Sequence, residues 1–256
     1  MSELVTYTIT DNVCTLIINR ESALNALNIA VLEALKNSLE ILSKDNSIFA
    51  LIIQGAGEKA FVAGADIKEM QSLDKNGIKD FIELGHKVMN HIENFPCCVI
   101  AQIKGFALGG GLELALACDF IVATPESKLG LPEVGLGVIP GFGGTVRLYN
   151  KAGIKVAKQM ILTGDTVNGL EAYRLGFVDY LATAEEIHEE VLKLVSSIKK
   201  RGPQAVKEAK KLLNNINATE FKKALSAEQK SFIILSASAE KKEGMAAFLE
   251  RRPPKF

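Results

Sequence analysis

The sequence predicts an α/β core followed by a helical C-terminal part. Before Gly144, short apolar and β-branched runs alternate with segments of helical periodicity, which is typical of strands interleaved with helices. After Gly144 the pattern is helical, apart from one short strand expected at Phe177–Leu181. The length of 256 residues suits one large domain, or one domain with an appendage.

The elements of the first half follow from their own patterns. Leu4–Thr10 and Val13–Asn19 alternate in polarity around Asp11 and Asn12, which predicts a β-hairpin. Apolar residues at helical spacing predict helices. These helices span Asn25–Ser43, Ala65–Gln71 and Lys79–Asn94, with another beginning near Gly109 or Gly110 and reaching Cys118. Short apolar runs predict strands at Ile48–Gln54, Cys97–Ile103, Phe120–Ala123 and Lys128–Leu131.

The second half reads as a series of helices. Thr166 looks like an N-cap region for one of them. The predicted helices are Thr145–Lys151, Ile154–Leu162, Gly169–Leu175, Ala184–Lys200, Pro203–Asn214 and Glu220–Leu249, the last with a break near Ser238.

The composition excludes several classes of protein. Lys+Arg and Asp+Glu both number 30, so the net charge of zero argues against a dominant nucleic-acid or membrane-surface role. The N-terminal residues show no signal-peptide pattern, and no apolar run reaches the ~18–20 residues of a membrane span. The four cysteines lie in apolar runs without zinc-binding spacing. We therefore expect a cytoplasmic protein with reduced core cysteines.

The stretch Lys104–Asp119 carries the strongest chemical indication. Between Gly105 and Cys118, Glu113 is the only carboxylate among apolar residues and glycines, and such a group is costly to desolvate without partners or a shifted pKa. If a helix begins near Gly110, its first N–H groups lack intrahelical partners and can bind an oxyanion. Glu113 would lie one turn along, on the same face. The alternative is a glycine turn before a core helix, with Glu113 in a structural ion pair.

Two further segments could complete such a site. The loop Ala60–Met70 also runs from a strand through a glycine turn into a helix near Ala65, so it could supply a second N–H donor. The alternative is an ordinary strand–helix connection. Glu133 follows a short strand, and two carboxylates facing one water can divide acid and base roles. The alternative for Glu133 is a solvated loop residue.

The sequence gives little support for nucleotide binding, a serine-hydrolase site, a metal site or RNA binding. No P-loop, dinucleotide fingerprint or GxSxG nucleophile elbow is present. His86 and His91 are five residues apart, on different helix faces, so we do not expect a metal site. A lysine-rich segment, Lys199–Lys211, could bind RNA, but a solvated helix face explains it better.

Five segments in order give the chain an end-to-end resemblance to a known family. They are Ile18–Asn28, Ala60–Met70, Gly105–Asp119, Leu129–Leu148 and Glu243–Arg252. The chain resembles the crotonase (enoyl-CoA hydratase/isomerase) superfamily, most closely the bacterial short-chain enoyl-CoA hydratase or 3-hydroxybutyryl-CoA dehydratase type. The resemblance implies an α/β, crotonase-like spiral of β-β-α units over residues 1–195. It implies a helical C-terminal trimerisation region over residues 196–256, and trimers that commonly pair into hexamers.

The resemblance also assigns roles to residues. The N–H groups of Ala65 and Gly110 would form an oxyanion hole for a thioester carbonyl, and Glu113 and Glu133 would be the catalytic glutamates. Ala65, Asp66, Ile67 and Lys68 would line the coenzyme A path. Lys59 and Lys68 would lie near the phosphates, and Phe248 and Arg251 would form a C-terminal contact. Coenzyme A is part of the substrate, and no metal or redox cofactor is expected.

The activity that the resemblance implies is reversible hydration of a trans-2-enoyl-CoA to a (3S)-3-hydroxyacyl-CoA, with a short-chain substrate such as crotonyl-CoA expected. Leu131 departs from the family pattern, because many hydratases have glutamine there. Three alternatives stay open: an enoyl-CoA isomerase of the same superfamily, an RNA-binding protein using Lys199–Lys211, and a subunit that binds acyl-CoA without turnover. Retention of both Glu113 and Glu133 favours the hydratase.

Overall fold

Two β-sheets organise the chain, and the computed structural model describes residues 3–216 and 218–256. The six-stranded sheet has the order β1-β2-β3-β5-β7-β10. Its strands are β1 (Val5–Thr10), β2 (Val13–Ile18), β3 (Ala50–Gly55), β5 (Cys98–Ile103), β7 (Phe120–Ala123) and β10 (Tyr180–Leu181). The four-stranded sheet consists of β4 (Ala60–Val62), β6 (Phe106–Leu108), β8 (Lys128–Gly130) and β9 (Thr166–Asn168), in that order.

The hairpin predicted at the N-terminus is present. β1 and β2 pair antiparallel, and Asp11 and Asn12 between them have φ values of 50° and 65°. Positive φ at both turn residues suits the twist of a two-residue hairpin, and Asp and Asn tolerate it better than most residues. All other pairs in this sheet are parallel, while β9 joins the smaller sheet antiparallel to β8.

The chain repeats one path three times. It places one strand in the larger sheet and the next in the smaller sheet, and then forms a helical segment. β3 and β4 lead to α2 (Ile67–Ser72) and α3 (Lys75–Glu93), and β5 and β6 lead to α4 (Gly110–Ala117). β7 and β8 lead to the 3₁₀ helix η2 (Glu133–Leu136) and α5 (Gly144–Thr163). These are the β-β-α units that the resemblance implies.

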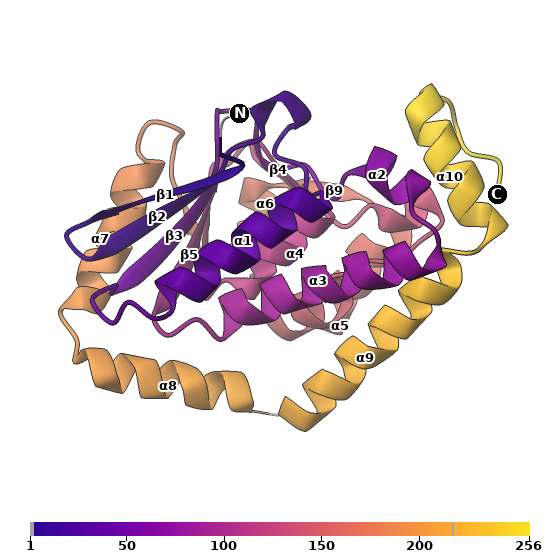
Figure 1. Ribbon diagram of the computed structural model, residues 1–256. Coiled ribbons are helices and arrows are strands. Elements are labelled where there is room, and N and C mark those ends of the chain that lie inside the picture. The colour runs from indigo at the N-terminus through magenta and orange to yellow at the C-terminus, as the bar shows by residue number, and fades with distance from the viewer. Residues whose placement is uncertain (1–2, 217) are drawn as a thin grey trace.

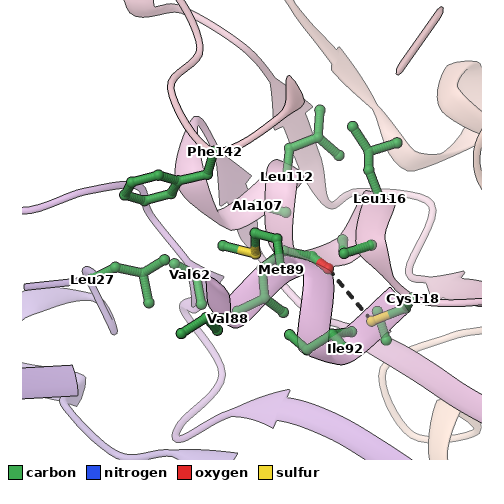
Figure 2. Packing of buried hydrophobic residues seen from close by; sticks show 14 of the residues in the cluster. Leu27, Val62, Val88, Met89, Ile92, Ala107, Leu112, Leu116, Cys118 and Phe142 are labelled. Carbon is green, nitrogen blue, oxygen red and sulfur yellow. Dashed lines mark hydrogen bonds between the residues drawn. The ribbon is translucent and has the colours of Figure 1, made fainter. Parts of the chain in front are cut away.

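Apolar residues on both faces of the larger sheet explain its continuous apolar strands. One face packs in the main core with α1 (Ile29–Leu42) and α3, and the other packs against α7 (Ile187–Lys199). Figure 1 shows α1 and α3 crossing the front of the molecule. Figure 2 shows the centre of the core, where Leu112 and Leu116 lie near Val88, Met89 and Ile92. Helix α4 is therefore enclosed by core, as its run of buried residues requires.

The last C-terminal helices pack against elements of the first part of the chain. Besides α6 (Gly169–Arg174), they are α8 (Pro203–Asn215), α9 (Ala218–Leu235) and α10 (Ala239–Glu250). Helix α9 packs against α3 and α5, and α10 against α2 and η2, at the end of the molecule away from α7 (Figure 1). Ser238 caps α10, which confirms the predicted break. Within the described ranges, no helix has the length and apolar character needed to cross a bilayer.

Some predicted boundaries are wrong for local reasons. The helix predicted from Asn25 begins at Ile29, because Asn25 has φ 59° and its buried side chain donates to the carbonyls of Ala56 and Ala60. Asn28 caps α1 instead. The helix predicted from Ala65 begins at Ile67, since the Asp66 side chain accepts from the N–H groups of Lys68 and Glu69.

Other elements were missed, or their limits differ from those predicted. Strands β4, β6 and β9 span three residues each, too short for a periodic pattern. Asn168 rather than Thr166 caps α6, because its side chain accepts from Glu171 N–H. Near Gly153, with φ 80° and ψ 169°, α5 contains the interruption expected between its two predicted helices.

Close contact between α4 and β4 gives a stability prediction. A Cβ on Gly111 would lie 2.0 Å from the Val62 carbonyl oxygen, so the helix can approach the strand only with glycine there. We expect Gly111→Ala to lower the free energy of unfolding by about 1–3 kcal/mol, despite the higher helix propensity of alanine. Urea denaturation measures this change. Gly135→Ala is the control, because nothing lies within 4 Å of its added Cβ. Equal stability of the two variants would contradict the close-approach explanation.

Candidate active site

Three parallel strand ends define the site. β4, β6 and β8 are neighbours in the smaller sheet, so their carboxyl ends share one edge. Ala65 follows β4, Gly110 follows β6, and Glu133 follows β8. These residues and Glu113 line a cavity of about 360 Å³. The two glycine turns meet there, because a Cβ on Gly109 would lie 3.9 Å from Gly64 Cα.

Two backbone N–H groups at this edge are available to a ligand. Leu27 N–H donates to Gly64 O at 2.8 Å, and Asp66 N–H donates to Leu27 O at 2.9 Å. In such a bridge the N–H of the intervening Ala65 points away from Leu27. Gly110 is the first residue of α4, where an N–H has no intrahelical acceptor. In residues 3–216 and 218–256, neither N–H is hydrogen-bonded.

Glu113 is buried in the first turn of α4, with 2% of its surface exposed. Its Oε1 accepts from the N–H groups of Phe142 and Gly144, both at 2.7 Å. Gly144 permits this contact, because a Cβ there would lie 2.9 Å from Glu113 Oε1. Burial raises the pKa of Glu113, and the charges of Glu133 and Glu228 add to the increase, whereas the two N–H donors oppose it. The alternative considered from the sequence, that Glu113 forms a structural ion pair, is wrong within the described residues. The partners of Glu113 are backbone N–H groups.

Glu133 has a different environment. It opens η2 beside Gly109, where a Cβ would lie 2.9 Å from Glu133 Oε1. Its Oε2 is buried and has no hydrogen-bond partner among residues 3–216 and 218–256. Burial raises the pKa of Glu133 to about 8, with a further increase from the charge of Glu228. Glu133 is therefore not a solvated loop residue.

The unequal hydrogen bonding divides the two carboxyl groups. Donors stabilise the ionised form of Glu113, while a buried oxygen without a donor favours the neutral form of Glu133. Two neighbouring buried carboxyl groups resist ionising together, so a single shared proton is expected between them. The arrangement suits a base and an acid facing one cavity.

The remaining cavity wall is apolar. Phe81 and Phe142 meet edge to face, with ring centroids 5.3 Å apart. Phe232 of α9 and Phe248 of α10 extend the wall. The larger aliphatic residues of the lining are Ile67, Met70, Ile82, Leu108, Leu136 and Val138. An apolar chain can therefore occupy the space beside the polar groups.

Of the other predicted binding residues, some line the cavity and some do not. Ile67 and Phe248 line the cavity, and 57% of the surface of Phe248 is exposed to solvent. Asp66 caps α2 and forms an ion pair with Arg20 at 2.8 Å, so its carboxylate is engaged in the fold. Lys59, Lys68 and Arg251 are exposed and do not line the cavity.

The lysine-rich segment has partners within the protein. Lys210 Nζ lies 2.7 Å from Asp119 Oδ2 and donates to Cys97 O at 2.9 Å. Lys211 lies 3.6 Å from Glu208. These contacts neutralise part of the proposed RNA-binding face. No cluster of three metal-ligating side chains occurs in the described parts of the chain.

Sequence reasoning missed the parts that come from distant segments. The N–H groups of Phe142 and Gly144 hold Glu113, and Phe232 and Glu228 come from α9. The sequence feature that could have indicated the backbone donors is the cluster of glycines at Gly141, Gly143 and Gly144.

The strand ends, free N–H groups and unequal carboxyl groups define an α/β protein with an oxyanion-binding type of site. Comparison with known proteins is more specific. The Enoyl-CoA hydratase/isomerase family profile matches residues 8–256. The chain is 44% identical over 246 residues to the crotonyl-CoA hydratase of Syntrophomonas wolfei, covering 96% of this chain and 95% of that protein. It is 39% identical to the short-chain-enoyl-CoA hydratase of Clostridium acetobutylicum, covering 92% and 90% of the two chains.

Solved structures agree in fold. The crystal structure of an enoyl-CoA hydratase from Mycobacterium avium subsp. paratuberculosis has a TM-score of 0.89 at 28% identity, with 99% of this chain and 98% of that chain covered. That of an enoyl-CoA hydratase from Bacillus anthracis has a TM-score of 0.81 at 34% identity, with the same coverage. The chain belongs to the enoyl-CoA hydratase/isomerase family, which confirms the predicted fold class.

The raised pKa of Glu133 predicts a pH-dependent stability. Its folded-state pKa of about 8 exceeds the ordinary 4.5, so the folded protein holds an extra proton in this window and loses stability as the pH rises through it. Glutamine stays neutral. The stability advantage of Glu133→Gln over the wild type should therefore be about 4–5 kcal/mol larger at pH 9 than at pH 4.

Urea unfolding at a series of pH values measures this difference. The control is Glu126→Gln, which neutralises an exposed glutamate. A pH-independent difference between Glu133→Gln and the wild type would show that Glu133 ionises normally in the folded protein.

Proposed function

We propose that the protein catalyses reversible addition of water to a short trans-2-enoyl-CoA, giving a (3S)-3-hydroxyacyl-CoA. The observation that carries the proposal is the pair of unequally hydrogen-bonded carboxyl groups beside the N–H groups of Ala65 and Gly110, which have no acceptor within residues 3–216 and 218–256. The names of the Syntrophomonas wolfei and Clostridium acetobutylicum relatives support enoyl-CoA hydration.

The oxyanion would be stabilised by backbone donors. The thioester carbonyl oxygen would accept from Ala65 N–H and Gly110 N–H, which are available at the cavity. Negative charge builds on this oxygen when a nucleophile attacks C3, so prepositioned donors lower the barrier. Loss of one such donor typically costs ~10²–10³ in rate.

The two glutamates would divide the proton transfers. Ionised Glu113 would remove a proton from water as the water oxygen bonds to C3. Electrons of the C2–C3 double bond would then move into the thioester enolate. Neutral Glu133 would donate its proton to C2, and the two glutamates would have exchanged protonation states. Return of the proton from Glu113 to Glu133, directly or through water, restores the starting state.

The cavity supports a short acyl chain. Phe81, Phe142 and Phe232 line it together, and a Cβ on Gly141 would lie 2.8 Å from both Ile82 and Phe232. Such crowding leaves little room for a long chain to extend beyond them. The resemblance implied a short acyl chain, and these aromatic residues support crotonyl-CoA as the substrate.

Coenzyme A would enter as part of the substrate, and we propose no metal or redox cofactor, because water addition requires no external electron carrier. Lys59, Lys68, Asp66 and Arg251 remain proposed coenzyme A contacts.

We also propose assembly into trimers or hexamers, with residues 196–256 contributing. Exposed Tyr149, Ile154 and Leu162 beside α9 support such a surface. Sedimentation equilibrium tests the assembly, and a monomer would contradict it.

An isomerase is the nearest competing function, because the family includes both activities. An isomerase needs to move one proton, whereas hydration uses both a base and an acid. The two distinct carboxyl environments therefore favour hydration. An RNA-binding role is disfavoured by the partners of Lys210 and Lys211.

Crotonyl-CoA tests the proposal through the absorbance of its conjugated thioester. We expect the wild type to remove this absorbance, and Glu113→Gln and Glu133→Gln each to lower kcat by ~10²–10⁴, the usual contribution of general acid–base catalysis. A chelator should leave the rate unchanged. A ten-carbon enoyl-CoA should react more slowly.

The matched control is Glu126→Gln, which should retain the wild-type rate. An unchanged absorbance despite crotonyl-CoA binding would overturn the hydratase proposal. If ¹⁸O from labelled water were absent from the product while the double bond moved, isomerisation would be the reaction.

A further inference from the structure

A third buried carboxylate, that of Glu228, accepts hydrogen bonds from the same short segment that holds Glu113. Glu228 of α9 is 5% exposed, and none of the predicted roles includes it. We propose that Glu228 is a positioning residue that fixes the backbone cradle of Glu113 and supplies a negative charge that keeps Glu133 protonated. The catalytic consequence rests on the proposed function, but the charge and geometry can be tested without it.

The contacts of Glu228 alternate with those of Glu113 along one short segment. Phe142 N–H and Gly144 N–H donate to Glu113 Oε1. Gly143 N–H donates to Glu228 Oε1 at 2.6 Å, and Thr145 N–H donates to Glu228 Oε2 at 2.9 Å. The Thr145 hydroxyl also donates to Glu228 Oε2. The four successive N–H groups of Phe142–Thr145, at the entry to α5, thus alternate between two carboxylates.

Because Glu113 and Glu228 bind neighbouring N–H groups of one segment, the position of Glu228 affects the hydrogen bonds of Glu113. The N-terminal N–H groups of a helix lack intrahelical acceptors and favour negative charge. Glu228 holds Gly143 and Thr145, so the N–H groups of the residues between and before them stay directed at Glu113. Moving the segment would lengthen the Glu113 contacts, and small displacements of catalytic groups can cost ~10²-fold in rate.

The surrounding groups leave much of the Glu228 charge uncompensated. From α3, His86 Nε2 lies 3.8 Å from Glu228 Oε1, but burial and the charge of Arg147 lower the pKa of His86 to about 4, so it is neutral at pH 7. From α5, Arg147 attracts Glu228, although its Nη2 is 3.0 Å from Glu93 Oε2. Among residues 3–216 and 218–256, the titratable carboxyl groups of Glu113 in α4 and Glu133 in η2 also lie near Glu228.

The electrostatic consequence has a definite sign. Burial raises the pKa of Glu228 to about 7, so it is increasingly ionised above neutral pH. Its negative charge disfavours ionisation of Glu133 and so extends the protonated form of Glu133 to higher pH. Removing the charge lowers the pKa of Glu133. The alkaline limb of the pH–rate profile should then move toward lower pH.

The experiment compares Glu228→Gln, Glu228→Asp and Thr145→Val with the wild type. Glutamine removes the charge and cannot accept both N–H groups, so we expect roughly a 10–100-fold loss of kcat and an acid-shifted alkaline limb. Aspartate keeps the charge on a shorter side chain, so kcat should fall while the limb stays near its wild-type position. Valine removes only the hydroxyl donor, which makes Glu228 harder to ionise and should shift the limb in the same direction as glutamine, with less loss of kcat.

A readout independent of turnover separates this inference from the proposed function. NMR titration of proteins carrying ¹³Cδ-labelled glutamate, with the Glu133 signal assigned by Glu133→Gln, gives the pKa of Glu133 directly. Thr145→Val provides the same test if Glu228→Gln does not fold. The pKa of Glu133 should be lower in both variants than in the wild type, whether or not crotonyl-CoA is hydrated.

The matched control is Glu220→Gln, which removes an exposed carboxylate from the same helix. It should change neither kcat nor the pKa of Glu133. An unchanged pKa of Glu133 in Glu228→Gln and Thr145→Val would overturn the electrostatic role. An unchanged kcat in both Glu228 variants of an active enzyme would overturn the positioning role.

Discussion

The structure depends on keeping the Glu113 carboxylate buried, although none of the described residues forms an ion pair with it. Such a group is stable in the interior only when donors replace its water. Two backbone N–H groups at the start of α5 do this, each at 2.7 Å. The segment can present them because glycines at 143 and 144 allow the backbone to pass close to Arg147 and Glu113 side-chain atoms. The hydrogen bonding that stabilises Glu113 also distinguishes it from Glu133.

The sheet brings these groups to one place. Parallel pairing of β4, β6 and β8 sends three chain segments out at one edge. Each strand is only three residues long, so the turn that follows is held close to the sheet. The two C-terminal helices then close the cavity from outside, with Phe232 on α9 and Phe248 on α10. Phe232 and Phe248 thereby make the cavity apolar and crowded on the side of the C-terminal helices.

The sequence predicts the fold class, the hairpin and most long helices, because their periodicity extends over many residues. It also singles out Glu113, whose apolar surroundings are visible in the adjacent residues. It does not reveal the three-residue strands, nor that α2 begins after the Asp66 cap. Glu228 is hidden for another reason: it occupies an ordinary helical position, and only tertiary packing places it against Gly143 and Thr145. Contacts between distant segments therefore account for what the sequence analysis lacked.

The central claim is that one proton is held unequally by two buried carboxyl groups. Neutron diffraction from a perdeuterated crystal of the free protein near pH 7 tests it most directly, since it locates deuterium on individual oxygens. The account predicts a deuteron on Glu133 and none on Glu113, whose Oε1 accepts the N–D groups of Phe142 and Gly144. A deuteron on Glu113 with an ionised Glu133 would contradict it.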